Sequence, residues 1–575
     1  MLVIVMATME LVGIASIGPF MALVGDMNLI NTNATLQKVY ALSGLTSPKD
    51  FLFFSGLTVL FLLGFSALVS IVTTWRLSFY GFAVGTEMSN RLYRFYLQRD
   101  WLFHVSSSSS QLINHVQSET SRVTHGILLP MLQLNARVAL AVFIGVSLFV
   151  FNPWVAILGL LVFSSGYFIV YKLVKNRLMR YDKNLSRASE IRYRLMIEGF
   201  GGIKDILMLQ RGVTFTEEFA NQGVPVTRTQ ALISAIGQIP RYFMEFLAFC
   251  TMVSLILVLV RFYNGDLSTV LPLIAIYGLA GFKLLPALQQ IYASVVTMKG
   301  NAAAFHAIKD DLKSALLVHE GKMTLNSKKI DLVMGSIQLK DVSFTYPTKS
   351  EPALIQANII IPANSTVGLV GATGSGKSTA IDLVMALILP QKGSLLVGGV
   401  PITVENREAW QRQIGFVPQS IFLTEGTIAE NVAFGLRVSE IDAARVNRAL
   451  QLAHLADFIA TLPEGIQTKV GERGVRLSGG QRQRIGIARA LYNDTKVLVF
   501  DEATSALDGI TEKIIMNAID ELSGERTIIL IAHRLKTVMN SDIIYILEGG
   551  RVVDSGTYRE LVDKNVKFRE MALNA

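Results

Sequence analysis

Long apolar stretches in the first half of the chain constrain its fold more than any other feature. Six of them are long enough to cross a bilayer, near residues 1–25, 51–75, 131–152, 154–174, 242–262 and 268–296. A helix needs about 20 mostly apolar residues to span the roughly 30 Å hydrocarbon core of a membrane. The chain of 575 residues is 51% hydrophobic and has a mean hydropathy of +0.44, which is too apolar for an ordinary soluble protein. We therefore predict a membrane domain of six helices.

The basic residues are placed as membrane topology requires. Lys and Arg are concentrated between the second and third apolar stretches, as at Arg91 and Arg94, and again after the fourth, at residues 172–194. Cytoplasmic loops carry such an excess of positive charge. The net charge of +9 therefore indicates orientation, and we expect no nucleic-acid partner. Because an even number of spans returns the chain to its starting side, both ends of the membrane domain are expected in the cytoplasm.

Two proline-free segments predict helical hairpins that continue beyond the membrane. No proline occurs at 49–129 or at 154–224, although a span needs only about 20 residues. At 1.5 Å per residue, about 25 extra residues on each leg would extend about 35 Å into the cytosol. We place the two tips near residues 100–110 and 208–219. The serines at 106–110 suit a helix start, because serine side chains cap free backbone N–H groups.

A few charged residues lie in or next to apolar sequence, where charge is costly and usually faces a cavity or a partner. The first span carries Glu10 and no basic leader, so we predict a retained helix and not a cleaved signal. Arg241 and Glu245 are four residues apart and can pair on one helix. Lys283 has no such local partner. Arg241 and Lys283 are the candidate substrate residues. We expect them to line a cavity whose positive charge attracts an anionic headgroup.

The second half of the chain alternates short β-rich runs with helical segments, which is typical of an α/β domain. A glycine-rich run follows the predicted strand at 366–370 and opens a helix, as a phosphate-binding loop does. In such a loop the backbone amides and the helix N-terminus hold phosphates, the lysine reaches the β- and γ-phosphates, and the serine binds Mg²⁺. The candidate ATP-binding residues are Gly371, Ala372, Thr373, Gly374, Ser375, Gly376, Lys377, Ser378 and Thr379.

A second apolar strand, predicted at 497–500, ends in two carboxylates, Asp501 and Glu502. Asp501 suits the coordination shell of Mg²⁺. Glu502 is the candidate general base, a role that requires a carboxylate within hydrogen-bond reach of the attacking water. The predicted cofactors are therefore ATP and Mg²⁺.

The run Leu477-Ser478-Gly479-Gly480-Gln481 precedes an arginine-rich helix. It resembles the LSGGQ signature that distinguishes ABC ATPases from other phosphate-loop proteins. A Ser-Gly-Gly turn at a helix start is a second anion site. In the family, this site faces the γ-phosphate held by the opposite subunit. The resemblance therefore implies a dimer, and a homodimer is the simplest case, with Ser478, Gly479, Gly480 and Gln481 contacting nucleotide.

Other positions also match the family pattern. The resemblance implies that Tyr346 stacks on adenine and that Gln419 links Mg²⁺ and water to the membrane domain. It implies further that Asp508 is the aspartate of the loop after the catalytic strand and that His533 contacts the γ-phosphate. The run 471–474 resembles the exporter-type segment that touches the intracellular helices.

Taken over the whole chain, the resemblance is to exporter-type half-transporters of the ABC family with the type IV fold. It implies a multidomain membrane protein: a six-helix transmembrane domain with long cytoplasmic hairpins at 1–305, a linker at 306–334 and an α/β ABC ATPase domain at 335–575. We expect it in the cytoplasmic membrane, with the ATPase in the cytosol. Family members usually place an amphipathic helix before the first span, which leaves open whether the natural chain begins upstream.

Three segments, 10–26, 239–249 and 283–291, are similar to bacterial lipid-linked oligosaccharide flippases, and the loop at 26–50 is long, as in those proteins. This implies ATP-driven flipping of a polyprenyl-pyrophosphate oligosaccharide by alternating access. Ser66, Gln289 and Gln290 stand where more cationic residues could have helped, so a less charged substrate stays open. The alternatives are a multidrug, lipid or peptide exporter and, in another class, a nucleotide-gated regulator or channel.

Overall fold

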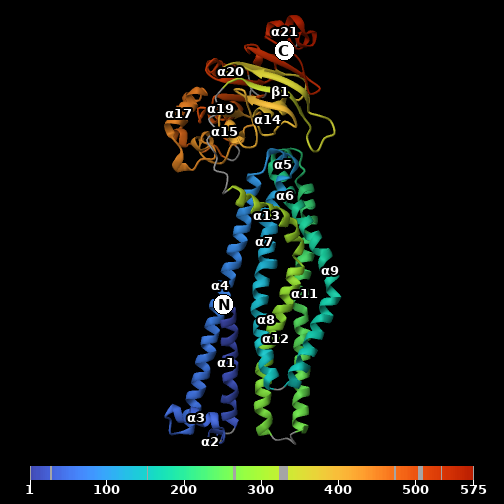
Figure 1. The fold of residues 1–575 in the computed structure, drawn as a ribbon, viewed down its shortest axis with the longest axis vertical. Helices are drawn as coiled ribbons and strands as arrows, with labels where there is room; N and C mark the ends of the chain where they lie inside the picture. The colour runs from blue at the N-terminus through green and yellow to red at the C-terminus, as the bar shows by residue number, and fades with distance from the viewer. Residues whose placement is uncertain are drawn as a thin grey trace. The chain divides into compact units, whose positions relative to one another are not determined.

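The computed structural model describes residues 2–25, 27, 29–151, 153–262, 267–322, 335–471, 474–502, 509–532 and 534–573. The chain separates into two units, Met1–Arg99 with Ser107–Thr324, and Asp100–Ser106 with Leu325–Ala575. The first consists of long helices and the second of mixed helices and strands (Figure 1).

Helices make up the first unit. They are α1 (Leu2–Gly25), α2 (Leu29–Thr32), α3 (Ala34–Ser43), α4 (Pro48–Leu97), α6 (Ser109–Asn114), the π-helix η1 (His115–Glu119), α7 (Thr120–Val123), the π-helix η2 (Thr124–Leu128), α8 (Leu129–Phe151), α9 (Pro153–Gly201), α10 (Ile203–Met208), α11 (Gly212–Phe262), α12 (Leu267–Lys299) and α13 (Ala302–Lys322).

Each of the six predicted spans falls within one of these long helices: α1, α4, α8, α9, α11 and α12. In the described part of the chain, three helical stretches are long and apolar enough to cross a membrane: Leu2–Gly25, Pro48–Leu97 and Ser109–Val150. Helix α1 packs along α4, α9 packs along α11, and α12 contacts both α8 and α11 (Figure 1). Small side chains let α12 approach α8, where Ala280 and Ala287 are buried beside Leu140 and Ile144.

The hairpin tips differ from the prediction in detail. The first break falls where expected, at α5 (Trp101–Ser106), which belongs to the second unit. Ser108 is at the N-cap of α6, but its hydroxyl contacts Ser110 Oγ at 2.6 Å and caps no backbone N–H. The second break begins earlier than predicted, because α9 ends at Gly201 and α11 already starts at Gly212. The pair Gly201-Gly202 explains this, since glycine is a poor helix former.

The first unit extends beyond the boundary predicted at residue 305. Helix α13 continues through the start of the predicted linker, and its residues Ala304 and Ile308 are fully buried. Its neighbours are α4, α7 and α9. The helix is therefore held by packing against the other helices of its unit, which the polar composition of residues 306–322 conceals.

Two sheets organise the second unit. One has the strand order β2-β1-β4-β5 and is antiparallel, and the other has the order β10-β9-β3-β8-β7-β6 with a parallel core. The strands are β1 (Ile337–Phe344), β2 (Leu354–Ile361), β3 (Thr366–Val370), β4 (Lys392–Val397), β5 (Val400–Pro401), β6 (Ile414–Val417), β7 (Val497–Asp501), β8 (Thr527–Ile531), β9 (Ile543–Glu548) and β10 (Arg551–Gly556).

The remaining helices of this unit are α14 (Lys377–Val384), α15 (Arg407–Gln411), α16 (Ile428–Val432), α17 (Ala443–Leu452), α18 (Ala456–Ala460), α19 (Gly479–Leu491), α20 (Gly509–Glu521), α21 (Tyr558–Lys564) and α22 (Val566–Leu573). Apolar side chains from both sheets form the core, with Trp410 and Phe344 fully buried on one side and Phe500 and Phe568 on the other. The carboxyl ends of β3, β8 and β7 lie at one edge of the parallel sheet, because these strands are adjacent and point the same way.

Close helix packing in the first unit gives a first prediction. A Cβ added to Gly85 on α4 would overlap the side chain of Thr124 on η2, so the variant Gly85→Ala overpacks this contact, at a typical cost of about 1–3 kcal/mol. We expect a lower melting temperature, measured by fluorescence-detected size exclusion. Gly145→Ala on α8 is the control, because a Cβ there meets no atom within 4 Å. Equal melting temperatures for the two variants would contradict the packing argument.

Candidate functional site

The predicted phosphate-binding loop lies between the buried strand β3 and α14. Gly371, Gly374 and Gly376 have φ values of 153°, 81° and 105°, in the region that favours glycine. A Cβ on Gly371 would overlap the carbonyl oxygen of Leu547, and one on Gly376 would approach that of Ala353. Glycine is thus required at these positions for two reasons: the backbone conformation and the close approach of other backbone segments of the same chain.

Side chains of the loop are arranged around this backbone. Lys377 is 5% exposed, and its Nζ donates to the carbonyl oxygens of Gly371 at 2.7 Å and Ala372 at 3.0 Å. Burial lowers the pKa of Lys377, while the charges of Glu502 and Asp501 oppose that shift.

Three hydroxyl side chains complete the loop. Ser375 Oγ is buried without a hydrogen-bond partner in the described structure. Ser378 is exposed, as an open metal position requires, and Thr379 is buried beneath it.

The predicted acidic pair stands at the end of β7. Asp501 is the last residue of the strand and pairs with Ile531 of β8. Glu502 follows with a φ of 49°, an unusual value for a residue with a side chain. Its Oε2 accepts a hydrogen bond of 2.7 Å from Nε2 of Gln419, which follows β6. The structure thus brings together Gln419 and Glu502, which are far apart in sequence.

Tyr346, expected to stack on adenine, lies just after β1 and is partly buried. Its ring meets Phe344 edge to face at 5.1 Å, and its hydroxyl is 3.4 Å from Thr379 Oγ1 and 3.4 Å from Asp382 Oδ2. Burial raises the pKa of Asp382 to about 6, and the charge of Asp501 acts in the same direction, while hydrogen bonds from Tyr346 and Trp101 oppose them.

Sequence reasoning missed Asp382 and its neighbour from the hairpin tip. Trp101 of α5 acts to lower the pKa of Asp382, and Asp100 forms an ion pair of 2.7 Å with Arg407 on α15. Leu102 packs against the apolar core beside β1. A signal was available, because Asp382 is the one acidic residue in the apolar helix that opens at the phosphate loop. Residues 100–106 are therefore an integral part of the second unit.

The signature run forms the N-terminus of α19. Ser478 is the N-cap, its Oγ accepts from the N–H of Gln481 at 3.2 Å, and Gln481 Oε1 accepts from the N–H of Ser478 at 2.8 Å. Ser478 and Gly479 are exposed, whereas Gly480 is buried. Within the described residues, no hydrogen bond joins this run to the phosphate loop. Asp508 and His533, and part of the run 471–474, lie outside the described residues.

The charged residues of the membrane helices separate into two kinds. Nε of Arg241 lies 2.6 Å from Oε1 of Glu245, so the predicted local pair forms on α11. Lys283 on α12 is partly buried, and in the described part of the chain no carboxylate lies within ion-pair distance of it. Gln290 on the same helix donates to Gln133 Oε1 on α8 at 3.0 Å. Lys283 is thus the better placed of the two candidate substrate cations.

The loop residues fit a bound triphosphate. The glycine cradle leaves no room for a Cβ at Gly371, Ser375 offers a buried hydroxyl without a partner, and Lys377 is held by carbonyl oxygens that a phosphate can replace. Exposed Ser378 and the carboxylate of Asp501 supply oxygen ligands of the kind that Mg²⁺ prefers.

Comparison with known proteins agrees with this site. The family model described as "ABC transporter" matches residues 354–505. Two proteins called "ATP-dependent lipid A-core flippase" align over almost the whole chain. That of Pseudoalteromonas translucida is 30% identical over 542 residues, 92% of this chain and 90% of that protein. That of Idiomarina loihiensis is 30% identical over 538 residues, again 92% and 90%.

A protein of the same description from Ralstonia nicotianae is 44% identical over 239 residues, 41% of this chain and 40% of its own length. The solved "Structure of a bacterial Atm1-family ABC exporter with ATP bound" superposes with a TM-score of 0.80 and covers 100% of this chain and 98% of that one, at 21% identity. This last likeness concerns the fold. The ATP site, the membrane helices and the full-length relatives lead to one conclusion: the chain belongs to the ABC transporter family, as an exporter-type half-transporter with an ATPase that drives transport.

Proposed function

We propose that this half-transporter flips a lipid-linked oligosaccharide, specifically a polyprenyl-pyrophosphate oligosaccharide, across the cytoplasmic membrane. The proposal rests on one observation: Lys283 lies within a membrane helix, and no carboxylate of the described structure pairs with its charge. A charge in the membrane is costly and is kept where it meets an opposite charge. A pyrophosphate between lipid and sugar supplies that charge, while the polyprenyl tail stays in the bilayer.

Two further observations support a lipid-borne substrate. The loop between α1 and α4 contains helices α2 and α3, in the place where the flippases that this sequence resembles carry a small external helix. Asn33 stabilises α3 as its N-cap, because Asn33 Oδ1 accepts from the N–H groups of Thr35 and Leu36. The relatives named for lipid A-core provide the second candidate, a phosphorylated glycolipid. Both candidates combine a lipid anchor, sugar and phosphate.

In the ATP site, the amides of the phosphate loop and Lys377 hold the phosphates, and Tyr346 supports adenine. Ser378, Asp501 and Gln419 would hold Mg²⁺, which neutralises charge on the transferring phosphoryl group when bound. Glu502 orients and polarises the attacking water. We assign Asp508 and His533 to the supporting roles that the family resemblance implies.

The second anion site points to a homodimer. Ser478 and Gly479 are exposed and make no hydrogen bond to the phosphate loop of their own chain among the described residues. In a head-to-tail pair, the signature of one copy would close over the γ-phosphate held by the other. ATP is then the ligand that binds the closed state more tightly, as a ligand-driven change of conformation requires, and alternating access follows from closure and hydrolysis.

Removing the carboxylate charge of Glu502 tests the catalytic assignment. We expect Glu502→Gln to reduce ATP hydrolysis in nanodiscs by about 100-fold or more, because a positioned general base contributes about 10²–10⁴-fold. ATP binding, measured with a fluorescent analogue, stays within about twofold, since the phosphate loop is unchanged. Glu405→Gln, at an exposed position of the same unit, is the control. Wild-type hydrolysis in Glu502→Gln would remove Glu502 from the mechanism.

Lys283 provides the test of the substrate. A polyprenyl-pyrophosphate oligosaccharide should stimulate ATP hydrolysis in nanodiscs, and Lys283→Ala should raise its half-maximal concentration about tenfold, because a hydrogen bond to a charged group is worth about 1.5–3 kcal/mol. Lys283→Arg should retain most of the stimulation. The matched control is Lys299→Ala, an exposed lysine at the end of the same helix.

The choice of lipids distinguishes the candidates. Stimulation by a lipid A-core glycolipid and not by the pyrophosphate lipid would replace the first candidate with the second. Stimulation by hydrophobic drugs alone, unaffected by Lys283→Ala, would contradict both and indicate a multidrug exporter.

A further inference from the structure

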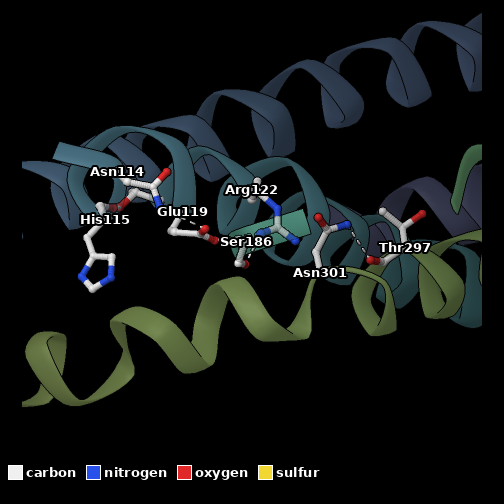
Figure 2. A network of polar contacts seen from close by, with 8 residues as sticks. Asn114, His115, Glu119, Arg122, Ser186, Thr297 and Asn301 are labelled. Atoms are coloured by element: carbon white, nitrogen blue, oxygen red, sulfur yellow. Dashed lines mark hydrogen bonds and ion pairs between the residues drawn. The ribbon is translucent and has the colours of Figure 1, made fainter. Parts of the chain in front are cut away.

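A buried ion pair within the first hairpin of the first unit is hydrogen-bonded to the second hairpin. Glu119, at the end of η1, is fully buried and accepts from Arg122 Nη1 at 2.9 Å and from Asn114 Nδ2 at 3.3 Å. Arg122 Nη1 also donates to Ser186 Oγ on α9 at 2.6 Å. Figure 2 shows Arg122 reaching across to Ser186, with Asn114 and Glu119 along the same helix. The hydrogen bond from Arg122 to Ser186 thus joins the first hairpin to the second.

A second polar contact lies one turn away and joins two other helices. Tyr96 on α4 donates its hydroxyl hydrogen to Asp311 Oδ2 on α13 at 2.6 Å. His115 Nδ1 is 3.0 Å from the Tyr96 oxygen and 3.5 Å from Asp311 Oδ2. Because the single phenolic hydrogen goes to the carboxylate, Nδ1 of His115 is the donor to the Tyr96 oxygen. This arrangement links α4, η1 and α13.

The backbone that carries these side chains is itself unusual. The π-helices η1 and η2 lie on either side of the short helix α7, and π-turns occur mostly as single turns inside α-helices, frequently at functional sites. The packing around them leaves little space, because a Cβ on Gly85 would overlap Thr124, and one on Gly126 would overlap Asn301. Asn301 is held by a hydrogen bond of 2.9 Å to the carbonyl oxygen of Thr297 (Figure 2). The helices therefore cannot slide past each other here without breaking contacts.

Tyr96 and Asp311 both lie close in sequence to the places where the chain passes from one unit to the other. Tyr96 precedes by four residues the segment Asp100–Ser106, which belongs to the ATPase unit. Asp311 lies on α13, the last described helix before the ATPase unit resumes at Leu325. The hydrogen bond from Tyr96 to Asp311 thus ties together two of the places where the polypeptide passes between the membrane helices and the ATPase.

We propose that Tyr96, His115 and Asp311, together with Glu119, Arg122 and Ser186, form a positioning network that makes these connections move as one body, so that a nucleotide-driven change in the ATPase reaches both hairpins. These residues lie on the helices of the first unit, at positions other than the phosphate loop and the candidate substrate residues. The inference depends on the coupling of ATP hydrolysis to transport and not on which lipid is carried. Breaking the network should uncouple the membrane helices while leaving the ATPase site intact.

Tyr96→Phe is the sharpest test, because it removes one hydroxyl and keeps the ring. Hydrogen–deuterium exchange is compared before and after trapping with ATP and vanadate. In the wild type, we expect peptides covering 109–128 and 180–200 to change protection together with peptides of the phosphate loop. In Tyr96→Phe, the loop peptides should respond as in the wild type, basal hydrolysis should stay within about twofold, and the response of the helical peptides should fall by at least about half.

Further variants separate positioning from mere stability. Asp311→Asn keeps an oxygen that can accept from Tyr96 and should retain most of the response, whereas Asp311→Ala should lose it. The double variant Tyr96→Phe/Asp311→Ala should be no worse than Asp311→Ala alone, because residues that act as a unit are not additive. Arg91→Ala, which breaks an exposed ion pair with Glu87 on α4, is the control and should behave as the wild type. A wild-type response of the helical peptides in Tyr96→Phe and Asp311→Ala would overturn the proposal.

Discussion

Backbone hydrogen bonding in lipid is the constraint on which most of this structure depends. Backbone N–H and C=O groups inside a bilayer must be satisfied within the protein, and the helix is the form in which a single segment satisfies its own. In α4, α9 and α11 the same helix continues well past the length of a span, as in Pro48–Leu97 and Pro153–Gly201. Because these helices are continuous, a displacement at their cytosolic ends is carried into the membrane region. The secondary structure that the bilayer requires thus also suits the proposed transmission of motion.

Local signals predicted the ATPase unit better than the connections around it. The strands predicted at 366–370 and 497–500 lie where expected, because a buried parallel strand is a continuous apolar run between turn residues, and the phosphate loop is marked by its glycines. Tertiary packing decided the rest. Helix α13 is polar in sequence and is held by the burial of Ala304 and Ile308. The ion pair of Asp100 with Arg407 joins residues far apart in the chain, which no local pattern reveals.

The membrane charges show how structure refines a sequence hypothesis. Spacing alone allowed Arg241 either to pair with Glu245 or to face a ligand, and the observed distance of 2.6 Å between them shows that the pair forms. An arginine neutralised by its own helix contributes little net charge to a cavity. The argument for an anionic lipid therefore moves to Lys283. The same reasoning applies to Glu10, which accepts a hydrogen bond of 2.9 Å from Ser70 on α4 and so takes part in the packing of α1.

The geometry of Glu502, the proposed general base, ties its carboxylate to two neighbouring elements of the ATPase unit. A residue with a side chain at a φ of 49°, as Glu502 has, costs of the order of 1–3 kcal/mol and persists only where its surroundings hold it. Here the N–H of Glu502 donates to the carbonyl oxygen of Ile531 at 3.2 Å, and Gln419 donates to its side chain at 2.7 Å. The strand pairing fixes the backbone, whereas the loop after β6 fixes the carboxylate. A rearrangement of that loop therefore reorients the base directly, without any change in the sheet that positions it.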